Sequence, residues 1–145
     1  MTRRGSYSHW MKELVRWSDT DLVGHVNNLA FVAYCETGRT HFMGHFVLKE
    51  AEHRAMFVIG KLTVNFLDEL NWPADVDVGT GVLAIGRRSV TTGQGLFEGE
   101  RCFATAESVM VCFDERTRTS IDIPDWARDY FARHLIPAAG ATIPP

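Results

Sequence analysis

The sequence predicts an α+β fold in which a curved antiparallel sheet of about five strands surrounds one long helix, followed by a short C-terminal helix. Three observations lead to this fold class. One stretch beginning near residue 29 has helical periodicity, several later stretches alternate with a period of two, and those stretches are joined by short links. With 145 residues, 46% of them hydrophobic, the chain can bury its own core. We expect one domain over residues 1–145, with residues 137–145 as a loose tail.

Composition argues against several classes of protein. The formal net charge of −3 does not favour a nucleic-acid partner, and no apolar run approaches the ~18 residues of a membrane span. The three cysteines (Cys35, Cys102 and Cys112) are odd in number and irregularly spaced, which indicates reduced packing residues. No apolar segment follows the two arginines near the N-terminus, so we read no secretory signal and expect a cytoplasmic protein.

The first predicted strand covers residues 9–18, and a polar connection leads from it into the helix. The connection ends in Asn27 and Asn28, and asparagine caps helices because its side-chain oxygen accepts an unpaired backbone N–H.

The long helix is predicted over residues 29–46. One continuous face contains Phe31, Tyr34, Cys35, Gly38 and Phe42. Glycine costs a helix about 1 kcal/mol relative to alanine, so Gly38 indicates a close approach to another backbone. Glu36 and Arg39 are spaced to pair, and Gly44 is a candidate for the C-terminal end.

Four strands follow in a predicted hairpin order, over residues 57–66, 76–85, 87–97 and 101–113. In the first of them Val58, Leu62, Val64 and Phe66 are expected on one face. Gly99 is expected in the turn between the last two strands. Pro124 then opens the short helix, where its missing N–H does no harm.

The segment of residues 16–28 is the place where acidic, imidazole and amide side chains crowd a strand-to-helix connection. A helix N-terminus offers unpaired N–H groups and partial positive charge, which suit a developing oxyanion. A carboxylate a few residues upstream can act there as a nucleophile or general base. On polarity alone, a plain polar turn with a helix cap explains the same residues.

The motif RWSDTDLVGHVNN of residues 16–28, followed by Phe31, Tyr34, Glu36 and Arg39, resembles the signature of the hotdog-fold acyl-CoA thioesterases. More narrowly, it is similar to the 4-hydroxybenzoyl-CoA thioesterase-like group. The resemblance covers about residues 9–135, with Phe31 as a departure where tyrosine is common.

The resemblance implies roles for individual positions. Asp21 matches the catalytic carboxylate, which attacks the thioester carbonyl or activates a water molecule. The N–H of Asn28 matches the oxyanion donor. Gly24 matches the tight turn into the helix, and His25 and Asn27 match positions that shape the site.

The resemblance also implies a dimer or tetramer with the active site at the interface and coenzyme A along the surface. No metal or cofactor is expected, because a thioester is already activated and coenzyme A is part of the substrate. Trp17 and Phe31 are candidates to line the acyl slot. Arg87, Arg88 and Ser89 are candidates to bind the phosphates of coenzyme A, although a solvated strand end explains them equally well.

Two other functions stay open at this point. A hotdog-fold hydratase or dehydratase would use a histidine with a carboxylate, for which His25 is available, and a binding module would hold acyl-CoA without cleaving it. His41 and His45 stand one helical turn apart but lack the glutamate of a zinc-binding motif, so no metal site is expected. An apolar outer surface that includes Phe57 and Ile59 supports self-association. Acyl length, fatty or aromatic preference, and coenzyme A or acyl carrier protein as the carrier are left undecided.

Overall fold

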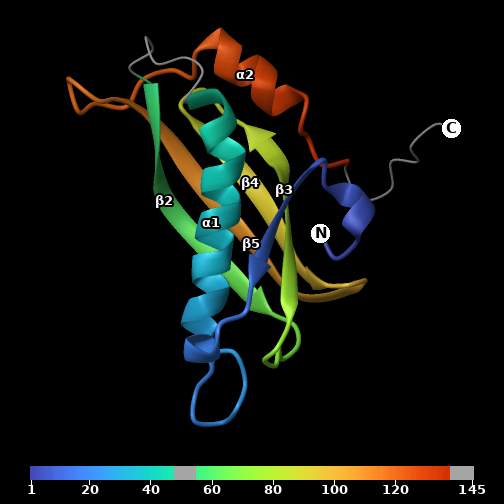
Figure 1. Cartoon of the computed structure of the whole chain (residues 1–145). Coiled ribbons are helices and arrows are strands. Elements are labelled where there is room, and N and C mark those ends of the chain that lie inside the picture. The colour runs from blue at the N-terminus through green and yellow to red at the C-terminus, as the bar shows by residue number, and fades with distance from the viewer. Residues whose placement is uncertain (48–54, 138–145) are drawn as a thin grey trace, which may run out of the picture.

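The structure is a computed structural model that describes residues 1–47 and 55–137, with the side chains of residues 1–44 and 55–137. Its elements in chain order are η1 (Arg4–Ser6), β1 (His9–Leu14), η2 (Trp17–Asp19), α1 (Asn28–Val47), β2 (Ala55–Phe66), β3 (Asp75–Ile85), β4 (Ser89–Glu98), β5 (Arg101–Asp114) and α2 (Asp125–Ala132). The sheet curves around α1, and α2 lies across one end (Figure 1). The predicted α+β class and its hotdog arrangement are confirmed. Of the expected tail at residues 137–145, residues 138–145 lie outside the described residues.

The five strands form one antiparallel sheet in the order β1-β3-β4-β5-β2. The predicted hairpin order holds for β3, β4 and β5, and Gly99 sits in the β4–β5 turn with a φ of +57°. It is wrong for β2 and β3, because β2 pairs with β5 at one edge while β1 pairs with β3 at the other. The chain therefore crosses the sheet between β2 and β3, which alternation within each strand could not reveal.

A β-bulge in β2 changes which side chains share a face. The register with β5 shifts between Ile59 and Lys61, and the extra residue rotates the strand by one position. As a result Leu62 pairs with the buried Ser108, whereas Val58 pairs with Val111 on the other face. The expectation that Val58 and Leu62 share a face is wrong for this reason.

The predicted apolar face of α1 is confirmed, since Phe31, Tyr34, Cys35 and Phe42 are all buried against the sheet. Gly38 lies on the same face. A Cβ built on Gly38 would stand 2.5 Å from Val78 Cγ1 and 3.1 Å from Gln94 Nε2. The close approach is thus to strand side chains and not to a second backbone.

Two expectations about α1 are corrected. Gly44 does not end the helix, which continues to Val47. Arg39 is buried and donates to Ser108 Oγ at 3.2 Å and to the Cys35 carbonyl at 3.5 Å, while Glu36 is exposed. Arg39 faces the sheet, and burial lowers the pKa of its guanidinium.

The cysteines pack as expected: Cys35 and Cys112 are buried and Cys102 is half-buried, all as free thiols. Within the part of the chain that the structure describes, no helix is both long enough and apolar enough to cross a membrane.

Candidate active site

The connection between β1 and α1 is a closed loop held by its own backbone. The Asn27 N–H donates to the Asp19 carbonyl at 2.8 Å, which closes the base of the loop. Nearer the tip, the Asp21 N–H donates to the His25 carbonyl at 2.9 Å and the Gly24 N–H donates to the Asp21 carbonyl at 3.0 Å. Gly24 has a φ of +92°, a conformation that other residues adopt only with strain. The turn therefore explains the glycine of the motif.

Asp21 presents its carboxylate at the exposed tip of this loop. Its Oδ1 accepts a hydrogen bond from the Val23 N–H at 2.8 Å, which orients the carboxylate. Its Oδ2 accepts no hydrogen bond from any group in the described residues. One carboxylate oxygen is thus accessible to a ligand or a water molecule.

The N-terminus of α1 follows directly. The side chain of Asn27 caps it, accepting from the Leu29 N–H at 2.7 Å, and the Asn27 carbonyl accepts from the Ala30 N–H at 3.0 Å. The Asn28 N–H donates no hydrogen bond within residues 1–47 and 55–137. An unpaired N–H at the positive end of a 20-residue helix is suited to stabilise an oxyanion.

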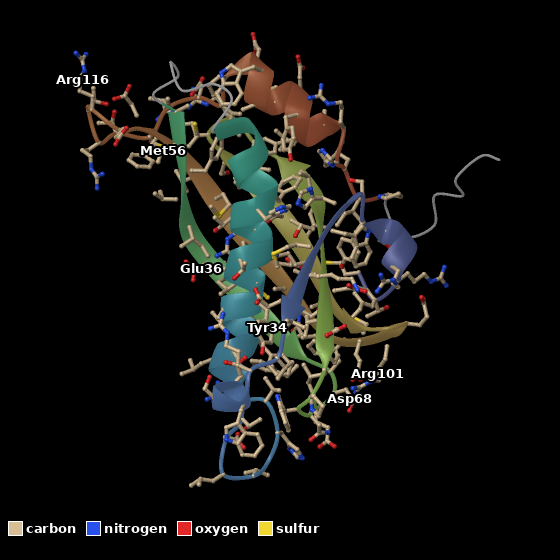
Figure 2. All side chains as sticks on the ribbon, viewed as in Figure 1. Tyr34, Glu36, Met56, Asp68, Arg101 and Arg116 are labelled. Atoms are coloured by element: carbon tan, nitrogen blue, oxygen red, sulfur yellow. The ribbon has the colours of Figure 1, made fainter. Side chains whose placement is uncertain are left out.

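The loop rests on the segment that joins β2 to β3. The Val26 N–H donates to the Leu70 carbonyl at 2.8 Å, and His25 Nε2 lies 3.1 Å from Glu69 Oε2. Arg101, the first residue of β5, fixes this segment, since its Nη1 donates to the Glu69 carbonyl at 2.9 Å and to Asp68 Oδ2 at 2.5 Å. Figure 2 shows Asp68 and Arg101 together at this end of the sheet.

Glu69 is the residue of this contact that sequence reasoning missed, because local composition indicates only plain turn residues at Asp68 and Glu69. The structure gives Glu69 a polar partner in the motif histidine, and the Arg101 guanidinium lowers the pKa of the Asp68 carboxyl. Local spacing gives no signal for either contact, because His25 and Glu69 are 44 positions apart in the sequence and Asp68 and Arg101 are 33 apart.

Large apolar side chains surround the Asp21 loop and are exposed. Trp17 is 71% exposed and meets Trp72 edge-on, with ring centroids 5.1 Å apart. The other exposed apolar residues of the connection and the helix start are Leu22, Val23 and Leu29. Trp17 is exposed on the same connection as Asp21, and its contact with an acyl group stays a prediction.

Phe31 is placed differently from the expectation. It is 3% exposed and packs against Phe66 and Phe103, with ring centroids 5.5 and 5.3 Å away. The described chain does not present Phe31 to a ligand, so its role here is packing beneath the start of α1.

Arg87, Arg88 and Ser89 lie at the opposite end of α1 from Asp21, where β3 passes to β4 beside α2 (Figure 1). Arg88 Nε donates to Asp122 Oδ1 at 2.9 Å, and Arg87 Nη1 lies 3.7 Å from Asp122 Oδ2. The Arg88 hydrogen bond, together with the charges of Arg87, Arg88 and Arg128, lowers the pKa of Asp122. Three guanidinium groups around one carboxylate leave a local positive charge, but within one chain they do not join the Asp21 loop.

Among the described residues, no group of three or more histidine, cysteine, aspartate or glutamate side chains is arranged to hold a metal ion. His41 Nδ1 lies 3.0 Å from His9 Nε2 on β1. The side chain of His45, one helical turn after His41, lies outside the described residues.

Comparisons with known proteins point to a single superfamily. The family model of the thioesterase-like superfamily matches residues 15–131. The uncharacterized protein YsmA of Bacillus subtilis (strain 168) is 28% identical over 123 residues, which cover 83% of this chain and 82% of YsmA. The residue range of the family match includes the loop and the strands β2 to β5, and it begins just after β1.

Solved structures share the fold. The structure of a predicted thioesterase from Bacillus stearothermophilus has a TM-score of 0.79 at 29% identity, covering 88% of this chain and 96% of its own. A thioesterase from Thermus thermophilus, solved in complex with coenzyme A and Zn, has a TM-score of 0.77 at 23% identity, covering 88% and 95%.

Proposed function

The chain belongs to the thioesterase-like superfamily, and on that premise we propose that it hydrolyses an acyl-CoA thioester to the free acid and coenzyme A. The observation that carries this proposal is the Asp21 loop. An exposed carboxylate with one unbonded oxygen is held by a closed loop whose base leads directly into the unpaired Asn28 N–H.

The proposed chemistry needs only these groups. Asp21 attacks the thioester carbonyl, or removes a proton from the water molecule that does, while the Asn28 N–H and the α1 dipole stabilise the oxyanion. In the first case, loss of the thiolate leaves an anhydride between the acyl group and Asp21, and water then hydrolyses it to the free acid and restores the carboxylate. The thiolate of coenzyme A then leaves without a strong general acid. His25, held by Glu69, and Gly24 shape the turn that carries Asp21.

Coenzyme A as the carrier is supported by two features. The Thermus thermophilus neighbour was solved with coenzyme A bound. In this chain Arg87, Arg88 and Arg128 keep a net positive charge around Asp122, which suits phosphate groups. The exposed Trp17 and Leu22, on the same connection as Asp21, suit a fatty or aromatic acyl group.

A second copy of the chain is part of the proposal, because one chain places Arg87 and Asp21 at opposite ends of α1. β2 is a sheet edge of 12 residues that exposes Met56, Val58 and Ile59, and such an edge favours pairing with another chain. Sedimentation at micromolar concentration should therefore show at least a dimer, with a monomer as the contrary result.

The main experiment is hydrolysis of a panel of fatty and aromatic acyl-CoA thioesters with free-thiol detection. Asp21→Asn should lower kcat by about 10²–10⁴-fold, the usual contribution of a catalytic acid or base. Asp129→Asn, on the exposed side of α2, is the matched control and should keep wild-type activity. Full activity of Asp21→Asn would remove Asp21 from the mechanism, and no hydrolysis by the parent would reject the function.

A complementation experiment tests whether the site is shared. Asp21→Asn is mixed with Arg87→Gln/Arg88→Gln under conditions that allow subunit exchange, at substrate concentrations below KM. If the parts come from different copies, half of the dimers are mixed and each regains one complete site, so activity should reach about a quarter of wild type. A mixture no more active than the mean of its components contradicts the shared site.

The His25–Glu69 contact favours one second candidate, a hydratase or dehydratase of enoyl or 3-hydroxyacyl thioesters. A histidine whose Nε2 lies 3.1 Å from a carboxylate oxygen is a usable general base. Loss of the enoyl absorbance of crotonyl-CoA, without release of thiol, would favour this activity over hydrolysis.

A further inference from the structure

Asp19 holds the base of the Asp21 loop through both its backbone and its side chain. Its carbonyl accepts from the Asn27 N–H at 2.8 Å, and its Oδ2 accepts from the Arg16 N–H at 2.9 Å. The same Oδ2 accepts from the Tyr34 hydroxyl at 2.7 Å. Asp19 therefore joins the incoming chain, the outgoing chain and the helix at one point.

Tyr34 connects Asp19 to the helix α1. It lies on the N-terminal half of α1 (Figure 2), is 4% exposed, and packs in the core cluster that also contains Val15, Val26 and Leu70. Its ring is thus fixed by neighbours from the same loop and from the segment below it. Burial and the neighbouring Asp19 raise the pKa of Tyr34 well above its usual range, so the hydroxyl stays a donor at neutral pH.

We infer that Tyr34 is a positioning residue, which through Asp19 sets the place of the Asp21 carboxylate relative to the Asn28 N–H. The inference rests on the proposed function. Only seven residues separate Asp19 from Asn27, and the Asp21–His25 hydrogen bond stiffens the loop between them. A shift at the base is therefore transmitted to Asp21, and a displacement of about 1 Å at reacting groups can lower a rate by about 10²-fold.

The test compares two tyrosines whose hydroxyl groups each donate a hydrogen bond that links α1 to another part of the chain. Tyr34→Phe keeps the buried ring and removes the donor to Asp19. Tyr130→Phe removes the donor to the Phe42 carbonyl, 2.8 Å away at the other end of the helix, and is the matched control. We expect kcat to fall at least about tenfold in Tyr34→Phe with KM within twofold, and no change in kcat for Tyr130→Phe.

Two further variants separate positioning from a general loss of structure. Asp19→Asn keeps an acceptor oxygen for Tyr34, whereas Asp19→Ala does not, so Asp19→Asn should retain more of the wild-type kcat. In the Asp21→Asn background, Tyr34→Phe should cause no further loss, because it acts through Asp21. Far-UV circular dichroism confirms that each variant is folded before its kinetics are interpreted.

The outcomes distinguish this inference from the proposed function. If Asp21→Asn is inactive but Tyr34→Phe keeps wild-type kcat, the positioning role alone is overturned. It is also overturned if Tyr34→Phe raises only KM, if Asp19→Ala matches wild type, or if the effects of Tyr34→Phe and Asp21→Asn multiply. If Asp21→Asn is fully active, Asp21 is removed from the mechanism and the positioning role falls with it. If the parent protein hydrolyses no acyl-CoA, the proposed function itself fails.

Discussion

Gly38→Ala offers a direct measure of how closely α1 packs on the sheet. In an exposed helix this substitution is stabilising by about 1 kcal/mol, because alanine loses less backbone entropy than glycine. At Gly38 the new methyl would stand 2.5 Å from Val78 Cγ1 and 3.1 Å from Gln94 Nε2. Val78 is completely buried in the sheet, so neither it nor the helix can move away freely.

The magnitude follows from a matched position in the same helix. A Cβ built on Gly44 has nothing within 4 Å, so Gly44→Ala should show the propensity gain alone, up to about 1 kcal/mol. Gly38→Ala receives the same gain but incurs an overpacking cost of about 1–3 kcal/mol. We expect the two variants to differ by about 1–3 kcal/mol, with Gly44→Ala the more stable.

Urea unfolding followed by circular dichroism measures the free energies of unfolding of Gly38→Ala and Gly44→Ala. Both are measured at the same protein concentration, so that any contribution from self-association is the same for the two variants. Gly38→Ala should further disturb Gln94, whose Nε2 donates to the Cys35 carbonyl at 2.9 Å. Equal stabilisation by the two substitutions would refute the reasoning, since it would mean that the helix does not depend on close contact at Gly38.

Three other predictions concern a buried thiol, a surface ion pair and a buried aromatic side chain. The free energy of unfolding should be level near pH 7–8 and fall above about pH 9. Burial raises the pKa of the Cys35 thiol from 9.0 to about 12, so the unfolded chain loses this proton at a lower pH than the folded chain and is favoured as the pH rises. Cys35→Ala should flatten that fall, by up to about 1.4 kcal/mol per pH unit, in urea unfolding across the pH range. Arg101→Gln should raise the pKa of Asp68 as followed by NMR titration, and an unchanged value would mean that the guanidinium does not act on that carboxyl. Phe131→Ala should lower the free energy of unfolding by about 3–5 kcal/mol in chemical denaturation, because Phe131 is completely buried against Phe42 and Phe57. Arg133→Ala, at an exposed position, is the control, and an equally small loss in both variants would show that α2 packs loosely.

Periodicity predicted the elements well because it reports which face of each one is apolar. The predicted helix of residues 29–46 is Asn28–Val47, and the strand of residues 76–85 is Asp75–Ile85. Asn27 caps the helix as expected. Arg87 and Arg88 precede their strand, which begins at Ser89, because they turn outward to Asp122.

What periodicity could not predict are contacts between elements that are distant in the sequence. The bulge next to Ile59 reverses the faces of β2 without any break in its alternation of apolar residues. Arg39 is charged yet buried, because Ser108 of β5 offers it an acceptor 69 residues away. The contacts of His25 with Glu69 and of Tyr34 with Asp19 depend on the same long-range packing.

The Asp21 loop divides into a buried base and an exposed tip, and this division determines what substitutions there can test. At the base, Val26 is buried, Asp19 is half-buried, and both are fixed to other elements, so changes there affect stability and geometry together. At the tip, Asp21 and Leu22 are exposed and make few contacts with the rest of the chain. Substitution of Asp21 should therefore leave the free energy of unfolding nearly unchanged while removing activity, because exposed loop positions contribute little to stability. A large loss of stability in Asp21→Asn would show that the carboxylate holds the loop in place, and its effect on activity could then no longer be assigned to chemistry.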